Sequence, residues 1–96
     1  MKPFINLGSV LKEWRIEMGL TQMTVAKVLG YTSPQFVSNW ERGMCLPPIE
    51  AIPMLGFLFK RKDDEILKLY IDVETTRIIE EYQAAKKRFK KPPKKH

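Results

Sequence analysis

Four polar side chains in the middle of the chain recur at helical spacing: Gln35, Ser38, Asn39 and Arg42. Glutamine and asparagine amides can bind adenine N6 and N7 in a bidentate manner, arginine can bind guanine O6 and N7, and serine can bond to either base. Apolar Val37 and Trp40 lie three residues apart in the same segment. The pattern therefore predicts a helix that buries one edge and presents base-reading groups on its free face. The alternative is an ordinary solvated polar face.

A second short helical pattern precedes this segment. Thr21 suits an N-cap, because its hydroxyl can accept a hydrogen bond from an N–H of the first helical turn. Small and apolar residues then recur at helical spacing: Val25, Ala26, Val28 and Leu29. Gly30 can end that helix with a positive φ, and Ser33 and Pro34 fit the N-cap and first position of the next helix. Two helices joined by such a turn form the plan of a DNA-binding helix-turn-helix.

The segment from Leu11 to Leu58 resembles the lambda repressor/Cro type of helix-turn-helix, often called the XRE family. It contains the pattern L-K-x-x-R-x-x-x-G-L-T-Q-x-x-V-A-x-x-L-G, followed by S-P-x-x-V-S-x-W-E-x-G. The stretch from Gly30 to Glu41 is one residue longer than in many members. The resemblance implies an all-α, five-helix fold, binding to double-stranded DNA, and a role in transcription regulation. It also implies that Arg15 pairs with Glu41 at the end of the base-reading helix.

The resemblance and the residue chemistry together select candidate DNA contacts. Gln35 and Asn39 are the expected base readers, while Phe36 can touch a thymine methyl or a sugar, or pack against Tyr31. The N-terminus of the preceding helix is expected to bind phosphate through backbone N–H groups and the Gln22 amide. The predicted DNA-contacting residues are Thr21, Gln22, Lys27, Ser33, Gln35, Phe36, Ser38, Asn39 and Arg42.

The net charge of +6 is distributed unevenly along the 96 residues. Residues 1–62 hold eight Lys or Arg and four Asp or Glu, residues 63–85 hold two and seven, and residues 86–96 hold seven and none. The two ends can meet a polyanion, while the acidic middle would be repelled by it.

The remaining composition argues against catalysis and against membranes. One cysteine, Cys45, and one histidine, His96, provide neither a nucleophile–base pair nor a metal site, and there is no glycine-rich phosphate loop. We therefore expect no enzymatic activity, no metal and no cofactor. The longest apolar run, Met54 to Phe59, is too short to span a bilayer, and the N-terminus lacks a signal-peptide pattern. A cytoplasmic, nucleoid-associated protein is expected.

Further helices are predicted on both sides of the helix-turn-helix. Ser9 suits the N-cap of a helix that ends near Met18, and Gly19 follows it. Pro48 fits the first position of a fourth helix. Pro53 would then lie past the first turn, where proline removes a hydrogen bond, so the pattern predicts a kink or a late helix start.

No glycine or proline interrupts the chain from Asp63 to about Lys91, which predicts one helix of about 40 Å. A first apolar stripe consists of Ile66, Leu69, Tyr70 and Val73. A second apolar stripe consists of Leu67, Ile71, Ile78, Tyr82, Ala85 and Phe89. Two stripes indicate two partners: the helix-turn-helix body and another surface. Homodimerisation through this helix is our hypothesis for the second stripe.

The sequence thus predicts a five-helix lambda-repressor-like domain with an extended C-terminal helix and a basic tail. Residues 1–62 are the expected DNA-binding domain, residues 63–91 a long helix for packing or dimerisation, and residues 92–96 a disordered basic tail. The expected function is that of a sequence-specific transcription regulator. The basic end leaves open an architectural, nucleoid-type DNA binder. The second apolar stripe leaves open an antitoxin- or adaptor-type protein-interaction module.

Overall fold

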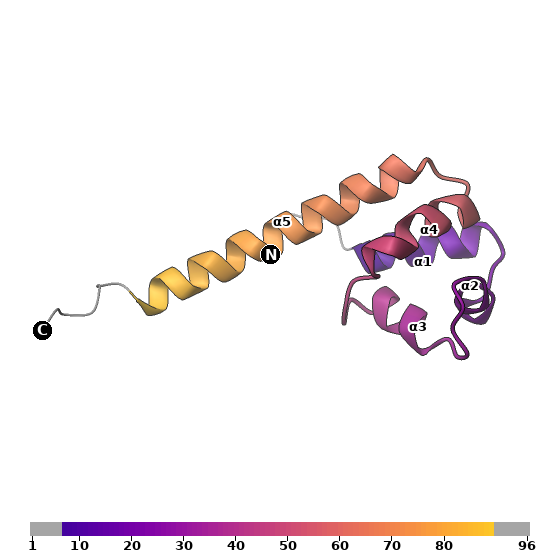
Figure 1. Ribbon diagram of the computed structural model, residues 1–96, viewed down its shortest axis with the longest axis horizontal. Helices are drawn as coiled ribbons and strands as arrows, with labels where there is room; N and C mark the ends of the chain where they lie inside the picture. The colour runs from indigo at the N-terminus through magenta and orange to yellow at the C-terminus, as the bar shows by residue number, and fades with distance from the viewer. Residues whose placement is uncertain (1–6, 90–96) are drawn as a thin grey trace, which may run out of the picture.

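The structure, a computed structural model, describes residues 7–89, and over this range it contains helices and turns but no strand. The elements in order are α1 (Leu7–Glu17), α2 (Gln22–Val28), α3 (Gln35–Glu41), the 3₁₀ helix η1 (Ile49–Ala51), α4 (Ile52–Leu58) and α5 (Asp63–Arg88). Figure 1 shows α1 to α4 gathered in one body, here called the head, from which α5 projects. The prediction of an all-α fold with an extended last helix is confirmed.

The core draws side chains from every α-helix. Its buried apolar members are Leu7, Leu11, Val25, Ala26, Val37, Trp40, Ala51, Ile52, Leu55, Phe59 and Ile66. Fully burying a large aliphatic or aromatic side chain stabilises a fold by about 1.5–3 kcal/mol. Because Ile66 is completely buried, the first turns of α5 belong to the same core as the head. One expected core residue, Val28, is instead 45% exposed.

Helix α1 begins at Leu7, two residues earlier than the sequence indicated. Ser9 therefore lies inside the helix and is not its N-cap. The reason is tertiary: Leu7 is buried, and Gly8 lies directly against the end of α3. A Cβ at Gly8 would collide with the carbonyl oxygen of Trp40 and would lie 2.8 Å from that of Glu41. A glycine is required for this approach.

The expected ends of the first two helices are confirmed. Gly19 and Gly30 have φ of +69° and +88°, the left-handed backbone that commonly ends a helix. Thr21 is the N-cap of α2, and its hydroxyl accepts a hydrogen bond from the backbone N–H of Thr24 at 3.0 Å.

The start of α3 differs by one residue from the expected position. The helix begins at Gln35, and Pro34 is its N-cap with φ −80° and ψ 5°, so Pro34 does not occupy the first helical position. The Ser33 hydroxyl still accepts from the backbone N–H of Gln35, at a long 3.4 Å.

The late start predicted for the fourth helix is confirmed. Pro48 is the N-cap of η1, and α4 begins only at Ile52, with Pro53 in its first turn. Pro48 is therefore not the first residue of α4. Pro53 is tolerated because the first N–H groups of a helix have no partner within that helix.

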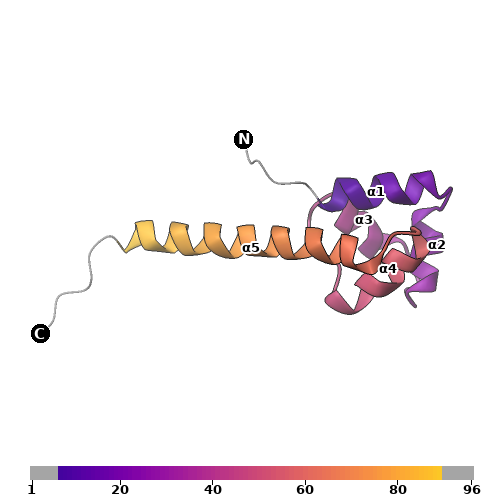
Figure 2. The same ribbon diagram turned by 90° about the horizontal axis from the view of Figure 1, so that it is seen from above.

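Helix α5 extends well beyond the head, because its 26 residues span about 39 Å at 1.5 Å per residue. Figure 2 shows it from above as a rod. Its first apolar stripe packs on the core, and burial raises the pKa of the Tyr70 hydroxyl. The helix ends at Arg88 rather than near Lys91. The predicted tail, residues 92–96, lies outside the described residues.

Candidate nucleic-acid interface

A buried ion pair holds the candidate recognition helix α3 in place. Arg15 Nε donates to Glu41 Oε2 at 2.6 Å, and Arg15 Nη2 donates to Oε1 at 3.1 Å. Arg15 Nη1 also donates to the carbonyl oxygen of Leu20 at 2.8 Å. The side chains of the pair are only 11% and 4% exposed. The pairing that the resemblance implied is thus present, and it joins the end of α1 to the end of α3.

The amide of Gln22 takes part in the same cluster. Its Nε2 donates to Glu41 Oε1 at 2.9 Å, so that α2 is also joined to the end of α3. One amide proton of Gln22 is therefore engaged within the protein. Its role as a phosphate contact stays a prediction, and it now concerns the second amide proton and the backbone N–H. Among the described residues, no buried side-chain nitrogen or oxygen lacks a hydrogen-bond partner.

Three of the predicted DNA contacts form one hydrogen-bonded row along α3 and its C-cap, Arg42. Gln35 Nε2 donates to Asn39 Oδ1 at 2.9 Å, and Arg42 Nη2 donates to the same oxygen at 2.8 Å. Gln35 and Arg42 are exposed, and Asn39 is half-buried. The structure therefore brings together the amide and guanidinium groups that could form hydrogen bonds with base edges.

Phe36 packs against Tyr31, which is one of its two predicted roles; the other, contact with a thymine methyl or a sugar, stays a prediction. Its ring centroid lies 4.9 Å from that of Tyr31, which in turn lies 6.0 Å from Trp40. This aromatic row fixes the turn before α3 on the core. Phe36 is nevertheless 53% exposed, so that part of its ring stays accessible beside Gln35.

The other predicted contacts are more scattered. Lys27 is exposed on α2, Ser33 is exposed in the turn, and Ser38 is half-buried on α3. Glu41 is the sole acidic residue between positions 21 and 43, and it is buried and paired with Arg15. The exposed surface of the two helices consequently carries no acidic side chain, which suits a polyanionic ligand.

A family model of helix-turn-helix domains matches residues 11–60. The chain belongs to this helix-turn-helix family. The resemblance to the lambda repressor/Cro type is thereby confirmed, and the family is one of DNA-binding transcription regulators. Curated proteins and solved structures gave no significant match.

The family match begins within α1, at residue 11, and ends at residue 60, before α5. Within residues 7–89, no group of histidine, cysteine, aspartate and glutamate is suited to hold a metal ion. Over the same residues, no helix is both long and apolar enough to cross a membrane.

The sequence analysis missed two contacts that position the helix-turn-helix. The first is the close approach of Gly8 to α3. Glycine weakens a helix, so a glycine inside a helical pattern can indicate that another element packs closely at that position. The second is the hydrogen bond from Gln22 to Glu41. No sequence signal distinguishes this role from phosphate binding, since a glutamine at a helix start suits both.

Proposed function

We propose that this helix-turn-helix protein is a sequence-specific transcription regulator that reads the major groove with α3. The observation that carries the proposal is the row of Gln35, Asn39 and Arg42 on a helix that the buried Arg15–Glu41 pair anchors. Side-chain amides and guanidinium groups match the major-groove edges of adenine and guanine. Such a regulator acts on the nucleoid in the cytoplasm.

Phosphate contacts are proposed around this row. The first turn of α2 after Thr21 offers backbone N–H groups, and Lys27, Ser33 and Arg42 offer side-chain donors near α3. These contacts would set the register of the protein on the duplex, while the base contacts would set the sequence.

A homodimer is the proposed active form. The second apolar stripe of α5 stays exposed in the single chain, with Ile78 and Tyr82 at 56% and 62%. A two-fold dimer would present two α3 helices to half-sites about 34–36 Å apart, one turn of the duplex.

Genome-wide mapping of bound DNA tests the proposal. A sequence-specific dimer should give sharp peaks that share a palindromic motif. Diffuse coverage would contradict it and would favour the second candidate, an architectural DNA binder. Lys86, Lys87 and Arg88 in the last turn of α5 support that candidate, because lysine and arginine bind phosphate without reading sequence.

An adaptor-type module is the other alternative, and the exposed stripe of α5 supports it. This module would keep its function when Gln35 and Asn39 are replaced by alanine, and would lose it through changes at Ile78 and Tyr82. Loss of regulation in the Gln35→Ala, Asn39→Ala double variant would exclude it.

A further inference from the structure

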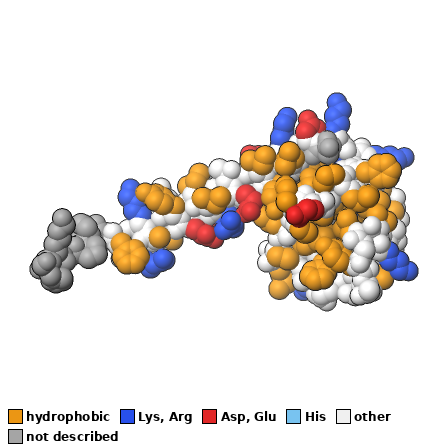
Figure 3. Space-filling view, viewed as in Figure 1, with side chains coloured by type: hydrophobic (Ala, Val, Ile, Leu, Met, Phe, Trp, Pro, Cys, Tyr) orange, Lys and Arg blue, Asp and Glu red, His pale blue; other side chains and the backbone are white. Residues whose placement is uncertain are grey.

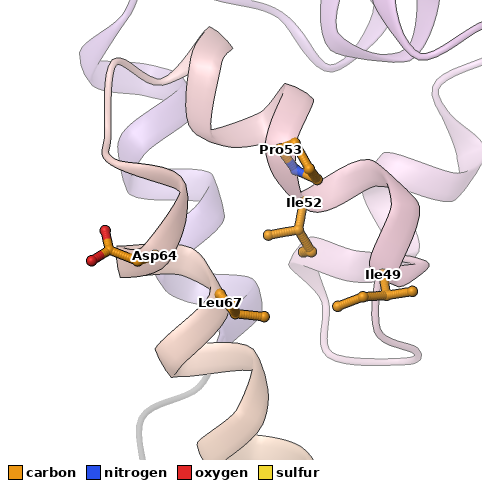
Figure 4. Close-up of a pocket in the computed structure, with 5 residues that line it drawn as sticks. All are labelled: Ile49, Ile52, Pro53, Asp64 and Leu67. Atoms are coloured by element: carbon orange, nitrogen blue, oxygen red, sulfur yellow. The ribbon is translucent and has the colours of Figure 1, made fainter.

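An apolar groove lies where η1 and α4 meet the first turns of α5. It has a volume of about 250 Å³, and its lining residues are Ile49, Ile52, Pro53, Asp64 and Leu67 (Figure 4). Ile49 and Leu67 are 47% and 38% exposed. The carboxylate of Asp64 is the single charge among these lining residues. The groove is thus apolar, and the Asp64 carboxylate at its edge points away from the apolar side chains (Figure 4).

The groove continues into the second apolar stripe of α5, because Leu67 belongs to both. Farther along the stripe, Ile71, Tyr82 and Phe89 are 51%, 62% and 70% exposed. Figure 3 shows hydrophobic side chains at intervals along the projecting helix, beyond the body of the head. Nothing within the described chain covers them, so the stripe needs a partner from outside it.

Five of the six residues of the second apolar stripe lie symmetrically about Ile78, whereas the position that mirrors the sixth, Tyr82, is Glu74. Leu67 lies eleven residues before Ile78 and Phe89 eleven residues after it; Ile71 lies seven before and Ala85 seven after. Two copies of α5 that run antiparallel, with a two-fold axis at Ile78, would therefore bring apolar residues onto apolar residues. Leu67 would meet Phe89, Ile71 would meet Ala85, and Ile78 would meet itself.

The charges of α5 favour the antiparallel direction. Residues 63–76 hold five acidic residues and one basic residue, whereas residues 77–89 hold four basic residues and two acidic ones. An antiparallel pair places the acidic half beside the basic half, and a parallel pair would place like charges together. Near the centre, Arg77 already neutralises Glu74 and Glu81 of its own chain, at 2.7 and 2.8 Å.

We propose that two copies pair antiparallel through α5 about Ile78, and that Phe89 of each copy occupies the groove beside Leu67 of the other. This inference rests on the proposed homodimer and specifies its geometry and the occupant of the groove.

The register also sets the distance between the two heads. Ile66, the α5 residue buried in the head, lies twelve residues from Ile78. At 1.5 Å per residue, the Ile66 positions of the two copies lie about 36 Å apart along α5. In Figure 1, α3 lies on the far side of α1 and α4 from α5, at the same end of the long axis as the first turns of α5. This separation of the two Ile66 positions is of the order of one duplex turn, the spacing between two half-sites.

Cysteine cross-linking tests the direction of pairing without DNA. In a Cys45→Ser background, one chain carries Ile71→Cys and a second chain, enlarged by a tag, carries Ala85→Cys. A short bismaleimide should join the two different chains when they are mixed, and should join neither variant to itself. Cross-links between two Ile71→Cys chains and between two Ala85→Cys chains would indicate a parallel pair and would overturn the proposal.

Sedimentation of full-length variants tests the residues of the interface. Ile78→Asp should raise the dimer dissociation constant by about 100-fold or more, since each dimer loses two buried isoleucines. Phe89→Ser should raise it by about tenfold or more through loss of the ring from the groove. Ile79→Asp is the matched control, because Ile79 is 53% exposed beside Ile78 but lies off the stripe. Its dissociation constant should stay close to that of the parent protein.

The same sedimentation experiments can contradict the proposed pairing. A monomer at high micromolar concentration, or equal weakening by Ile78→Asp and Ile79→Asp, would overturn the proposal; circular dichroism verifies that each variant is folded. DNA binding that still depends on Gln35 and Asn39 would then leave the proposed function standing. The two failures are therefore distinguishable.

Discussion

Glu41 is the residue on which three helices converge. It ends α3, accepts two hydrogen bonds from Arg15 of α1, and accepts a third from Gln22 of α2. A carboxylate that is 4% exposed is costly to desolvate unless it is paired in this way. The position of the base-reading helix thus depends on one buried charge.

Removal of Arg15 should destabilise the fold, because Glu41 would then be a buried charge without its partner. Arg15→Ala leaves the Glu41 carboxylate buried without its cation, and the free energy of unfolding should fall by about 3–5 kcal/mol. Urea denaturation measures the change. An Arg15→Met, Glu41→Leu double variant removes both charges and should recover most of the loss, as a double-mutant cycle would show. A loss below about 1 kcal/mol for Arg15→Ala would mean that the pair behaves as a surface ion pair.

Substitution of Gly8 by alanine should have the opposite effect on stability to the same substitution at an exposed helix position. At an exposed helix position, glycine to alanine stabilises by about 1 kcal/mol. Gly8→Ala should instead destabilise by about 1–3 kcal/mol, because the new methyl group meets the Trp40 and Glu41 carbonyl oxygens. Thermal unfolding gives the comparison, with Glu13→Ala on the exposed face of α1 as control. A Gly8→Ala variant as stable as the parent would contradict the close packing of α1 on α3.

At the scale of elements, features that depend on the hydrogen bonds and backbone preferences of neighbouring residues were predictable from the sequence. The Thr21 cap, the glycine helix ends and the late start forced by Pro53 follow from residues within one turn of each feature. The start of α1 was not predictable from nearby residues, because Leu7 is buried in the core and Gly8 contacts α3, which is distant in sequence. The start of α3 differed from the expected position by one residue. The row on α3 was predictable from its residue types, whereas the engagement of Gln22 with Glu41 required the fold.

The cap of α2 offers a test at this scale. Thr21→Ala removes the hydroxyl that accepts from the Thr24 N–H, and should lower the free energy of unfolding by about 1 kcal/mol. Thr32→Ala, at an exposed position of the turn, is the control and should change it little. Equal effects in denaturant titrations would show that the Thr21 cap contributes nothing specific.

At the scale of the whole molecule, the chain separates two tasks. The head carries the exposed basic and polar surface of α2 and α3, while α5 carries an apolar stripe that the family match does not cover. Family membership accounts for the first, and the symmetry of the stripe about Ile78 supports our account of the second. The division at residue 62 stays a prediction.

Salt should govern DNA affinity strongly. If the bound protein makes six or so phosphate contacts in all, affinity should fall by about 10³-fold between roughly 50 and 200 mM salt. Fluorescence anisotropy across a salt series gives the slope, and Lys27→Ala should reduce it by about one phosphate contact per protomer. An unchanged slope in this variant would remove Lys27 from the interface.

The central claim is that α3 reads bases, and in vitro selection of bound DNA from a random library tests it most directly. The parent protein should enrich a two-fold motif whose half-sites lie about 34–36 Å apart. The Gln35→Ala, Asn39→Ala double variant should lose that motif while it still binds DNA at low salt, and Gln83→Ala on α5 should retain it. Enrichment of the same motif by the double variant would contradict the account.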